Sequence, residues 1–254
     1  MTVRSSIAMT HRETLRAARG QLALLAEAER VYLQAQPYRL IHGYDPRGGV
    51  YSVRVEVVRD VPAEVPVLAA SVLRNAGAAL DALAATLVPA DAAAGPPRRF
   101  PIYDSLPQFA QRTRRSLAAM PDEVQATLEE LQPYHTFGGF RNDLLWLLRE
   151  LAASTSPPLA AGALRADSAV GVNTARHVEI TGDLRVVAGA FEHGKVVVSV
   201  TATVAGPDPK LDLYVKPVYE LALARDGPAR GAALVGTLGA LCDHVEQTVF
   251  ARLS

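Results

Sequence analysis

The sequence predicts an α+β fold in which a helical bundle packs with an antiparallel sheet. Two periodicities indicate this: some segments carry apolar residues at the spacing of a helix face, and others alternate apolar and polar residues as half-buried strands do. The strand patterns form an early hairpin and a later meander, and helical patterns fill most of the remainder. Helices and strands that cluster separately along a chain are typical of α+β folds.

The first half of the chain is expected to be mainly helical. A long amphipathic helix begins at a capping-box pattern and stops before Pro37, and an Ala- and Leu-rich helix follows the hairpin. Pro107 and Pro121 stand where helices can begin, which predicts two short helices. The expected helices span residues 10–36, 66–88, 106–119, 121–131 and 141–153; the hairpin strands span 38–44 and 50–58, and residues 89–97 form a loop.

After a loop that reaches about residue 175, the period of the pattern changes to two. Turn residues at 192–194 and 206–209 divide this region. The expected strands span residues 177–181, 184–191, 195–204 and 211–224, and a final helix spans 231–252. We therefore expect a single domain over residues 1–254, with the helix, hairpin and helical bundle in 1–158 and the strand meander and terminal helix in 159–254.

Composition argues against several functional classes. The chain carries 26 basic and 26 acidic residues, and this balance does not favour nucleic acid or an anionic membrane as a partner. The single cysteine, Cys242, excludes an internal disulfide and a metal site with several thiolates. We find no signal-peptide pattern and no uncharged window of membrane-spanning length, so we expect a cytoplasmic protein without a membrane span.

The sequence contains no clear motif for a cofactor, a metal or a hydrolytic nucleophile. Its six histidines are scattered, and Cys242, Asp243 and His244 are successive helix residues that point in different directions. No glycine-rich nucleotide-binding loop and no G-x-S-x-G elbow is present. Paired carboxylates occur as runs such as Glu129-Glu130, which we interpret as solvated helix surface. We expect neither a cofactor nor a metal.

Polar residues interrupt the apolar helix expected at 66–88. Arg74 and Asp81 are seven residues apart and share a helix face, whereas Asn75 and Asp81 do not. One interpretation is a structural salt bridge between Arg74 and Asp81. The other is a binding site to which Arg74, Asn75 and Asp81 contribute.

A second polar group, Gln132, Tyr134 and His135, precedes the glycine pair at 138–139. One interpretation is a pocket in which Tyr134 and His135 are the acid and base candidates, with Gln132 as a binding residue and Trp146 as an apolar wall. A histidine titrates near neutral pH and can donate or accept a hydrogen bond there. The alternative is a helix C-terminal motif whose aromatic ring fills the core.

Several of these residues belong to motifs that resemble a family of uncharacterised, mostly actinobacterial proteins. Members of that family carry an apolar helix reading N-L-R-x-A-L-D-H-L and later segments reading F-P-I-[FY], Q-P-Y-H, L-W-x-L-x-E-L and D-K-H-R. The matching segments here are Asn75 with Leu80-Asp81-Ala82-Leu83, Phe100-Pro101-Ile102-Tyr103, Gln132-Pro133-Tyr134-His135 and Leu145-Trp146 through Leu151. The resemblance covers most of the length of the chain.

The Arg-x-x-x-x-His spacing of the family's apolar helix also resembles HEPN domains, helical bundles that often dimerise and in some cases cut RNA. Here Gly77 and Ala82 stand at those two positions, and residues 154–158 replace D-K-H-R. The resemblance therefore implies a catalytically degenerate HEPN-like binding or regulatory module. We expect it to form a homodimer through the helix at 66–88 or through the C-terminal helix, because the apolar surface of the former exceeds what one buried face needs. Two alternatives stay open: an enzyme with a repurposed apolar pocket for a small organic molecule, using Tyr134 and His135, and a relative of RNA-processing or defence ribonucleases.

Overall fold

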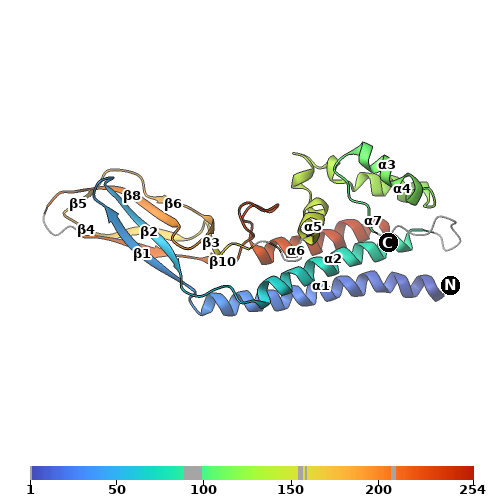
Figure 1. The fold of residues 1–254 in the computed structure, drawn as a ribbon, viewed down its shortest axis with the longest axis horizontal. Helices are drawn as coiled ribbons and strands as arrows, with labels where there is room; N and C mark the ends of the chain where they lie inside the picture. The colour runs from blue at the N-terminus through green and yellow to red at the C-terminus, as the bar shows by residue number, and fades with distance from the viewer. Residues whose placement is uncertain (1, 89–98, 154–156, 158, 207–209) are drawn as a thin grey trace. The chain divides into compact units, whose positions relative to one another are not determined.

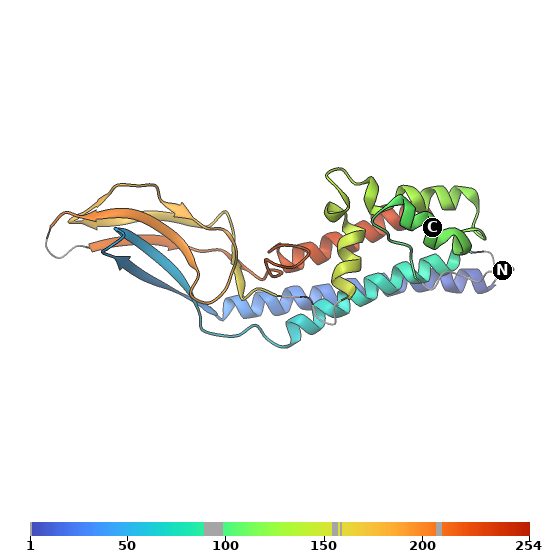
Figure 2. The same ribbon diagram turned by 45° about the horizontal axis from the view of Figure 1, so that its top comes forward.

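The computed structural model confirms the α+β fold (Figures 1 and 2). The chain forms two compact units, which we name the helical unit and the strand unit. The helical unit comprises residues 1–26, 64–157 and 235–254, and the strand unit comprises 27–63 and 158–234. The structure describes residues 2–88, 99–153, 157, 159–206 and 210–254, and only the backbone of 2–10, 114–116 and 174.

The two units contain other segments than the two parts that we expected on either side of residue 158. The chain does pass from the helical unit to the strand unit after residue 157, but the early hairpin belongs to the strand unit. The reason is strand pairing: the second hairpin strand pairs with a strand of the meander, with Val53 opposite Val198. A two-stranded hairpin is marginal alone, and a third strand with an apolar face stabilises it.

Helix α2 supplies much of the core of the helical unit. Ten of its residues are buried, including Leu73, Leu80 and Leu83. Figures 1 and 2 both show α1 and α2 side by side. The two long helices are α1 (Thr2–Gln34) and α2 (Glu64–Thr86). Shorter ones are α5 (Leu144–Ala153) and α6 (Leu234–His244), and α6 continues as a π-helix, η3 (Val245–Phe250), and then as α7 (Ala251–Leu253).

Two short helices, α3 (Leu106–Leu117) and α4 (Asp122–Glu130), complete the helical unit with the 3-10 turns η1 (Pro133–His135) and η2 (Phe140–Asn142). Proline lies in the first turn of α3 and at the N-cap of α4, as expected from the sequence. Phe109 of α3 and Leu128 of α4 are buried and anchor the two helices.

The described residues of the strand unit form three antiparallel groups of strands. The largest sheet has the order β1 (Tyr38–Asp45), β2 (Val50–Val57), β8 (Val196–Val204) and β5 (Val178–Ile180), and β6 (Arg185–Val186) also pairs with β8. The other groups are β10 (Tyr219–Glu220), β3 (Gly162–Leu164) and β7 (Gly189–Phe191), and the pair β4 (Ala169–Arg176) and β9 (Lys210–Lys216). In β2, Val53 and Val55 are buried while Arg54 is exposed, which confirms the predicted alternation.

An aromatic cluster fixes part of the strand unit. The ring centroid of Tyr38 lies 4.6 Å from that of Tyr219 and 5.1 Å from that of Phe191. The Tyr38 hydroxyl donates a hydrogen bond to the carbonyl of Ala161 at 2.9 Å, and burial raises the pKa of Tyr219 to about 12. A Cβ on Gly162 would lie 2.4 Å from the Tyr38 hydroxyl, so this close approach requires glycine.

Several boundaries differ from the sequence prediction. Helix α1 begins at Thr2, so the capping-box pattern at residue 10 does not start it. The segment 184–191 divides into two strands, since Gly189 has a φ of +97°, and 211–224 divides after Lys216, where Pro217 lacks the N–H that a ladder needs. The stretch expected as a loop up to residue 175 contains β3 and most of β4. The predicted loop at 89–97 and most of the turn at 206–209 lie outside the described residues.

Helix α2 is also long and apolar enough to cross a membrane, judged by length and composition, although the sequence had predicted no span. The core helix of a soluble protein passes the same test, and half of this apolar window is buried inside the structure. The helix therefore gives weak support to a membrane span.

Candidate functional site

The predicted site residues Tyr134 and His135 lie just beyond the end of α4 and contact its last turn. Glu129 Oε1 accepts a hydrogen bond from the Tyr134 hydroxyl at 2.9 Å and lies 2.7 Å from His135 Nε2. The Tyr134 and His135 rings are also in contact, with their centroids 4.6 Å apart. We name these three residues the Glu129 cluster. Sequence interpretation had treated Glu129 as solvated surface; the side chain is 32 % exposed, but it has two partners that the sequence did not predict.

The electrostatics of the Glu129 cluster assign a role to each group. The hydrogen bond from His135 is the main cause that lowers the pKa of Glu129, against the effect of burial, so the carboxylate is ionised at neutral pH. Burial, followed by the hydrogen bond to Glu129, raises the pKa of Tyr134, so its hydroxyl remains a donor. Tyr134 is therefore unsuited to act as a base, while the exposed His135 keeps its Nδ1 available.

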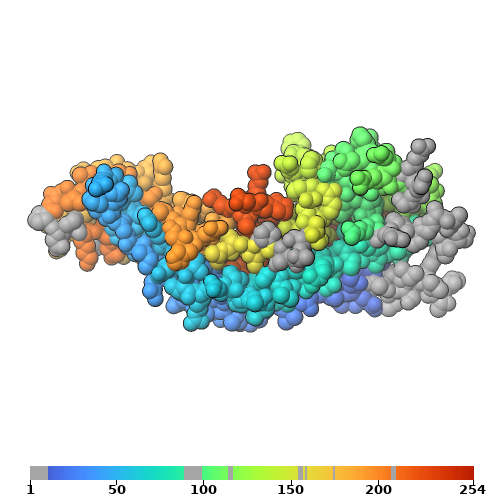
Figure 3. Space-filling model, viewed as in Figure 1, coloured from blue at the N-terminus to red at the C-terminus, as the bar shows by residue number. Residues whose placement is uncertain are grey.

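The Glu129 cluster adjoins a broad surface groove between α3 and α4. The groove has a volume of about 900 Å³ and is open to solvent. Among the described residues that line it, apolar side chains predominate and Glu129 is the ionised group. The lining includes Leu106, Phe109, Ala110, Leu117 and Ala126. Figure 3 shows α3 and α4, coloured green, at the surface of the helical unit.

Gln132, predicted as a binding residue, is instead a buried structural link. Its side chain is 1 % exposed. Its amide nitrogen donates to the carbonyls of Pro101 and Leu128, at 3.0 and 2.8 Å, and its oxygen accepts from the N–H of Tyr103 at 3.0 Å. These three bonds attach the segment before α3 to the end of α4, so Gln132 helps to set the walls of the groove.

The glycine pair after His135 lies in a loop whose two ends are hydrogen-bonded to each other. Gly138 and Gly139 have φ values of +82° and +101°, which glycine adopts at little cost. Thr136 donates to Asp143 Oδ2 at 2.7 Å, while Asp143 Oδ1 accepts from the first free amides of α5. Phe137 at the loop tip is 99 % exposed.

The polar residues of α2 do not form the predicted salt bridge. Arg74 is exposed and donates to the hydroxyl of Ser71 at 2.9 Å. Asp81 accepts from the N–H of Phe100 at 2.8 Å, and burial raises the pKa of this carboxyl. The two side chains share a helix face, as predicted, but each has a nearer partner of its own.

Asn75 and Trp146 do not join the Glu129 cluster. Asn75 is half-buried in α2, and its side chain makes no hydrogen bond with any described residue. The Trp146 ring lies edge-on to Phe140, with the centroids 5.8 Å apart. Neither residue lines the α3–α4 groove. Sequence reasoning missed the groove, although α3 carries a signal for it. The apolar residues at 106, 109, 110 and 117 mark one face of a strongly amphipathic helix.

Metal and thiol chemistry find little support in the structure. Among the described residues, no group of three His, Cys, Asp or Glu side chains is placed to hold a metal ion. Cys242 is buried, and burial raises the pKa of its thiol, so it is a protonated core residue at neutral pH.

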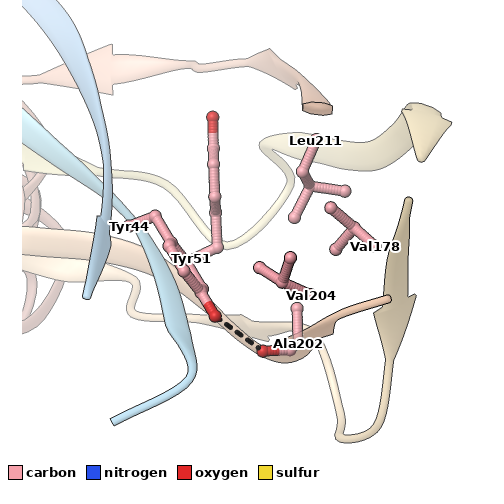
Figure 4. Close-up of a pocket in the computed structure, with 6 residues that line it drawn as sticks. All are labelled: Tyr44, Tyr51, Val178, Ala202, Val204 and Leu211. Atoms are coloured by element: carbon pink, nitrogen blue, oxygen red, sulfur yellow. Dashed lines mark hydrogen bonds between the residues drawn. The ribbon is translucent and has the colours of Figure 1, made fainter. Parts of the chain in front are cut away.

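The strand unit contains a small pocket lined by Tyr44, Tyr51 and four aliphatic residues (Figure 4). The Tyr44 hydroxyl donates to the carbonyl of Ala202 at 3.4 Å across its base. The volume of the pocket is about 60 Å³, which is room for about two waters. The pocket is thus too small for an organic ligand.

Comparison with known proteins gives no further guide to the site. No family model, no curated protein and no solved structure matches the chain significantly. The motif resemblance described above therefore stays a prediction, and functional inference depends on the geometry of the site.

Proposed function

We propose that the protein is a non-catalytic binding module that takes an apolar ligand into the α3–α4 groove. The observation that carries this proposal is the groove itself, which has a volume of about 900 Å³ and, in its described lining, mostly apolar side chains together with the ionised carboxylate of Glu129. Binding sites commonly combine apolar walls with a few polar groups that orient the ligand. The open groove does not exclude water, which argues against a reaction centre.

The proposal keeps the HEPN-like resemblance but not its ribonuclease chemistry. Gly77 and Ala82 occupy the two positions at which the family carries arginine and histidine, and neither supplies a cation or a proton-transfer group. A side chain at Gly77 would meet no atom within 4 Å of its Cβ, so a lack of space does not explain why this chain has no arginine at that position. We propose a regulatory role in the cytoplasm that needs no cofactor, no membrane and no nucleic acid.

We also propose that the chain forms a homodimer, with α2 as one candidate surface. Val67 of α2 is apolar yet has an exposed fraction of 62 %, and the half-buried Pro66 and Leu68 flank it. A symmetric contact is the commonest way in which two copies cover such a patch. Light scattering should give twice the mass of one chain, and a strict monomer at micromolar concentration would contradict this part of the proposal.

The enzyme alternative has one supporting observation. His135 Nε2 lies 2.7 Å from the ionised Glu129, and a histidine oriented by a carboxylate can act as a general base. In that case Tyr134 would act as an acid or donor only, because its pKa is raised. His135→Ala should then abolish turnover while leaving ligand affinity within about twofold. Under the binding-module proposal the same change should weaken binding and there is no turnover to lose.

The neutral apolar dye Nile red tests the proposed groove. We expect saturable fluorescence enhancement with the wild-type protein, and at least tenfold weaker binding after Ala110→Asp or Ala126→Asp. Both alanines are exposed, so an aspartate places charge in the groove without entering the core. Ala78→Asp, at an exposed position of α2 outside the groove, is the matched control and should bind as wild type. Equal binding by all four proteins would contradict the proposal.

A further inference from the structure

A buried histidine without a hydrogen bond lies where α1 meets the C-terminal helix of the helical unit. The His11 side chain is 2 % exposed, and neither ring nitrogen has a partner among the described residues. Its ring packs edge-on against Phe250, with the centroids 4.7 Å apart. Buried polar atoms are nearly always paired, so an unpaired imidazole needs an explanation.

The helix opposite His11 is irregular at the same place. Residues Val245–Phe250 form a π-helix, although this stretch contains no glycine or proline that would break a helix. A π-turn widens the helix by one residue, is rare in proteins and is often associated with functional sites. Here it positions Glu246 and Phe250, the two residues that the C-terminal helix contributes to an adjoining cavity.

The cavity has a volume of about 210 Å³ and is lined on the α1 side by Arg12, Leu15, Arg16 and Arg19. Its charges do not balance. The single charge of Arg19 is shared between Glu246 and Asp243, the latter at 2.8 Å, so the three arginines and these two carboxylates together keep a net charge of +1.

Arg12 and Arg16 form neither an ion pair nor a side-chain hydrogen bond with any described residue, and both are exposed. They are one helical turn apart and therefore neighbours on the surface of α1. Two guanidinium groups without an ion-pair partner among the described residues thus face a cavity whose base, formed by Leu15 and Phe250, is apolar.

We propose that Arg12 and Arg16 hold a small oxyanion, a phosphate group or a carboxylate, in the cavity between α1 and the π-helix. Guanidinium groups present paired N–H donors that match the oxygens of both anions. The volume corresponds to about seven waters, enough for a phosphate group with part of its hydration. The apolar base strengthens each charge-assisted hydrogen bond, since it lowers the local dielectric. This site is separate from the α3–α4 groove and does not depend on the function proposed for it.

His11 gives the proposal an internal reporter. Burial, and then the neighbouring Arg12 guanidinium, lower the pKa of His11. An anion bound to Arg12 would offset the second cause, so occupancy of the site should raise the pKa of His11.

The experiment is a titration of the full chain with inorganic phosphate and, in parallel, with acetate, followed by calorimetry and by NMR of the His11 imidazole. We expect saturable phosphate or acetate binding and an upward shift in the His11 pKa. Tighter binding of phosphate would assign the phosphate class, and tighter binding of acetate the carboxylate class. Sodium chloride at matched ionic strength controls for general screening.

Matched variants identify the cavity. The double variant Arg12→Gln, Arg16→Gln changes two exposed side chains and should fold normally, yet lose at least tenfold in affinity. Arg47→Gln, on the exposed hairpin turn of the strand unit, should bind as wild type. The proposal is overturned if neither anion saturates, if the double variant binds as wild type, or if Arg47→Gln loses as much affinity.

Discussion

Replacing Gln132 with leucine separates a structural role from a functional one more cleanly than any other change near the groove. Leucine has a similar volume but forms none of the three hydrogen bonds that the amide makes to Pro101, Tyr103 and Leu128. Each such bond contributes about 0.5–1.5 kcal/mol net, and the partner groups would be left unpaired in a site where the side chain is 1 % exposed. Because the buried leucine side chain adds apolar burial that offsets part of this loss, we expect the free energy of unfolding to fall by about 2–4 kcal/mol.

Urea denaturation followed by circular dichroism measures this loss, and the melting temperature should fall by about 5–15 °C. Gln125→Leu is the control, because the half-buried Gln125 makes a single side-chain hydrogen bond, to the carbonyl of Met120. It should cost about 1 kcal/mol or less. The reasoning is refuted if the two variants are equally stable, or if Gln132→Leu abolishes dye binding without lowering stability.

Three further predictions concern stability. The pKa values of His11 and His244 are lowered, in both cases mainly by burial, so the folded state favours neutral rings while the unfolded chain gains protons below about pH 6.5. Stability should be full well above that pH and fall as the pH drops through about 6.5 towards the lowered pKa values of the folded rings, and His11→Phe should flatten a plot of melting temperature against pH. Gly162→Ala should cost about 1–3 kcal/mol in chemical denaturation, because its new Cβ overlaps an aromatic side chain; an unchanged midpoint would contradict the described contact. Asp143→Ala removes the cap of α5 and should lower stability by about 1 kcal/mol in the same assay. Asp143→Asn keeps a side-chain oxygen that can accept from the same amides, so this variant should retain most of the stability.

The sequence predicted those parts of the structure that depend on local patterns. Long apolar periodicities located α2 and the C-terminal helix, and strict alternation located the hairpin. Short or mixed patterns failed: β3 has three residues, and β4 contains glycine and asparagine in place of a clean alternation. Such strands form because partners distant in the chain pair with them, and a local window cannot detect these partners.

The candidate site was predicted only in part for a related reason. Tyr134 and His135 were identified as polar residues near a glycine pair, but Gln132 looked similar to them and proved structural. Its partners Tyr103 and Pro101 are 29 and 31 residues away along the chain, so no local pattern reports the bonds. Glu129 was dismissed because paired glutamates usually face solvent, although its position six residues before His135 was visible in the sequence.

Photolabelling with an alkyl diazirine, followed by peptide mass mapping, tests the central claim most directly. If the α3–α4 groove is the apolar binding site, covalent label should concentrate in peptides that contain Leu106–Leu117 and Asp122–Glu130, and Ala126→Asp should remove most of it. Because the exposed Phe137 is another apolar contact for such a probe, its peptide serves as the internal reference. Label that is spread evenly over the chain, or concentrated on Phe137 and unchanged in the variant, would contradict the account.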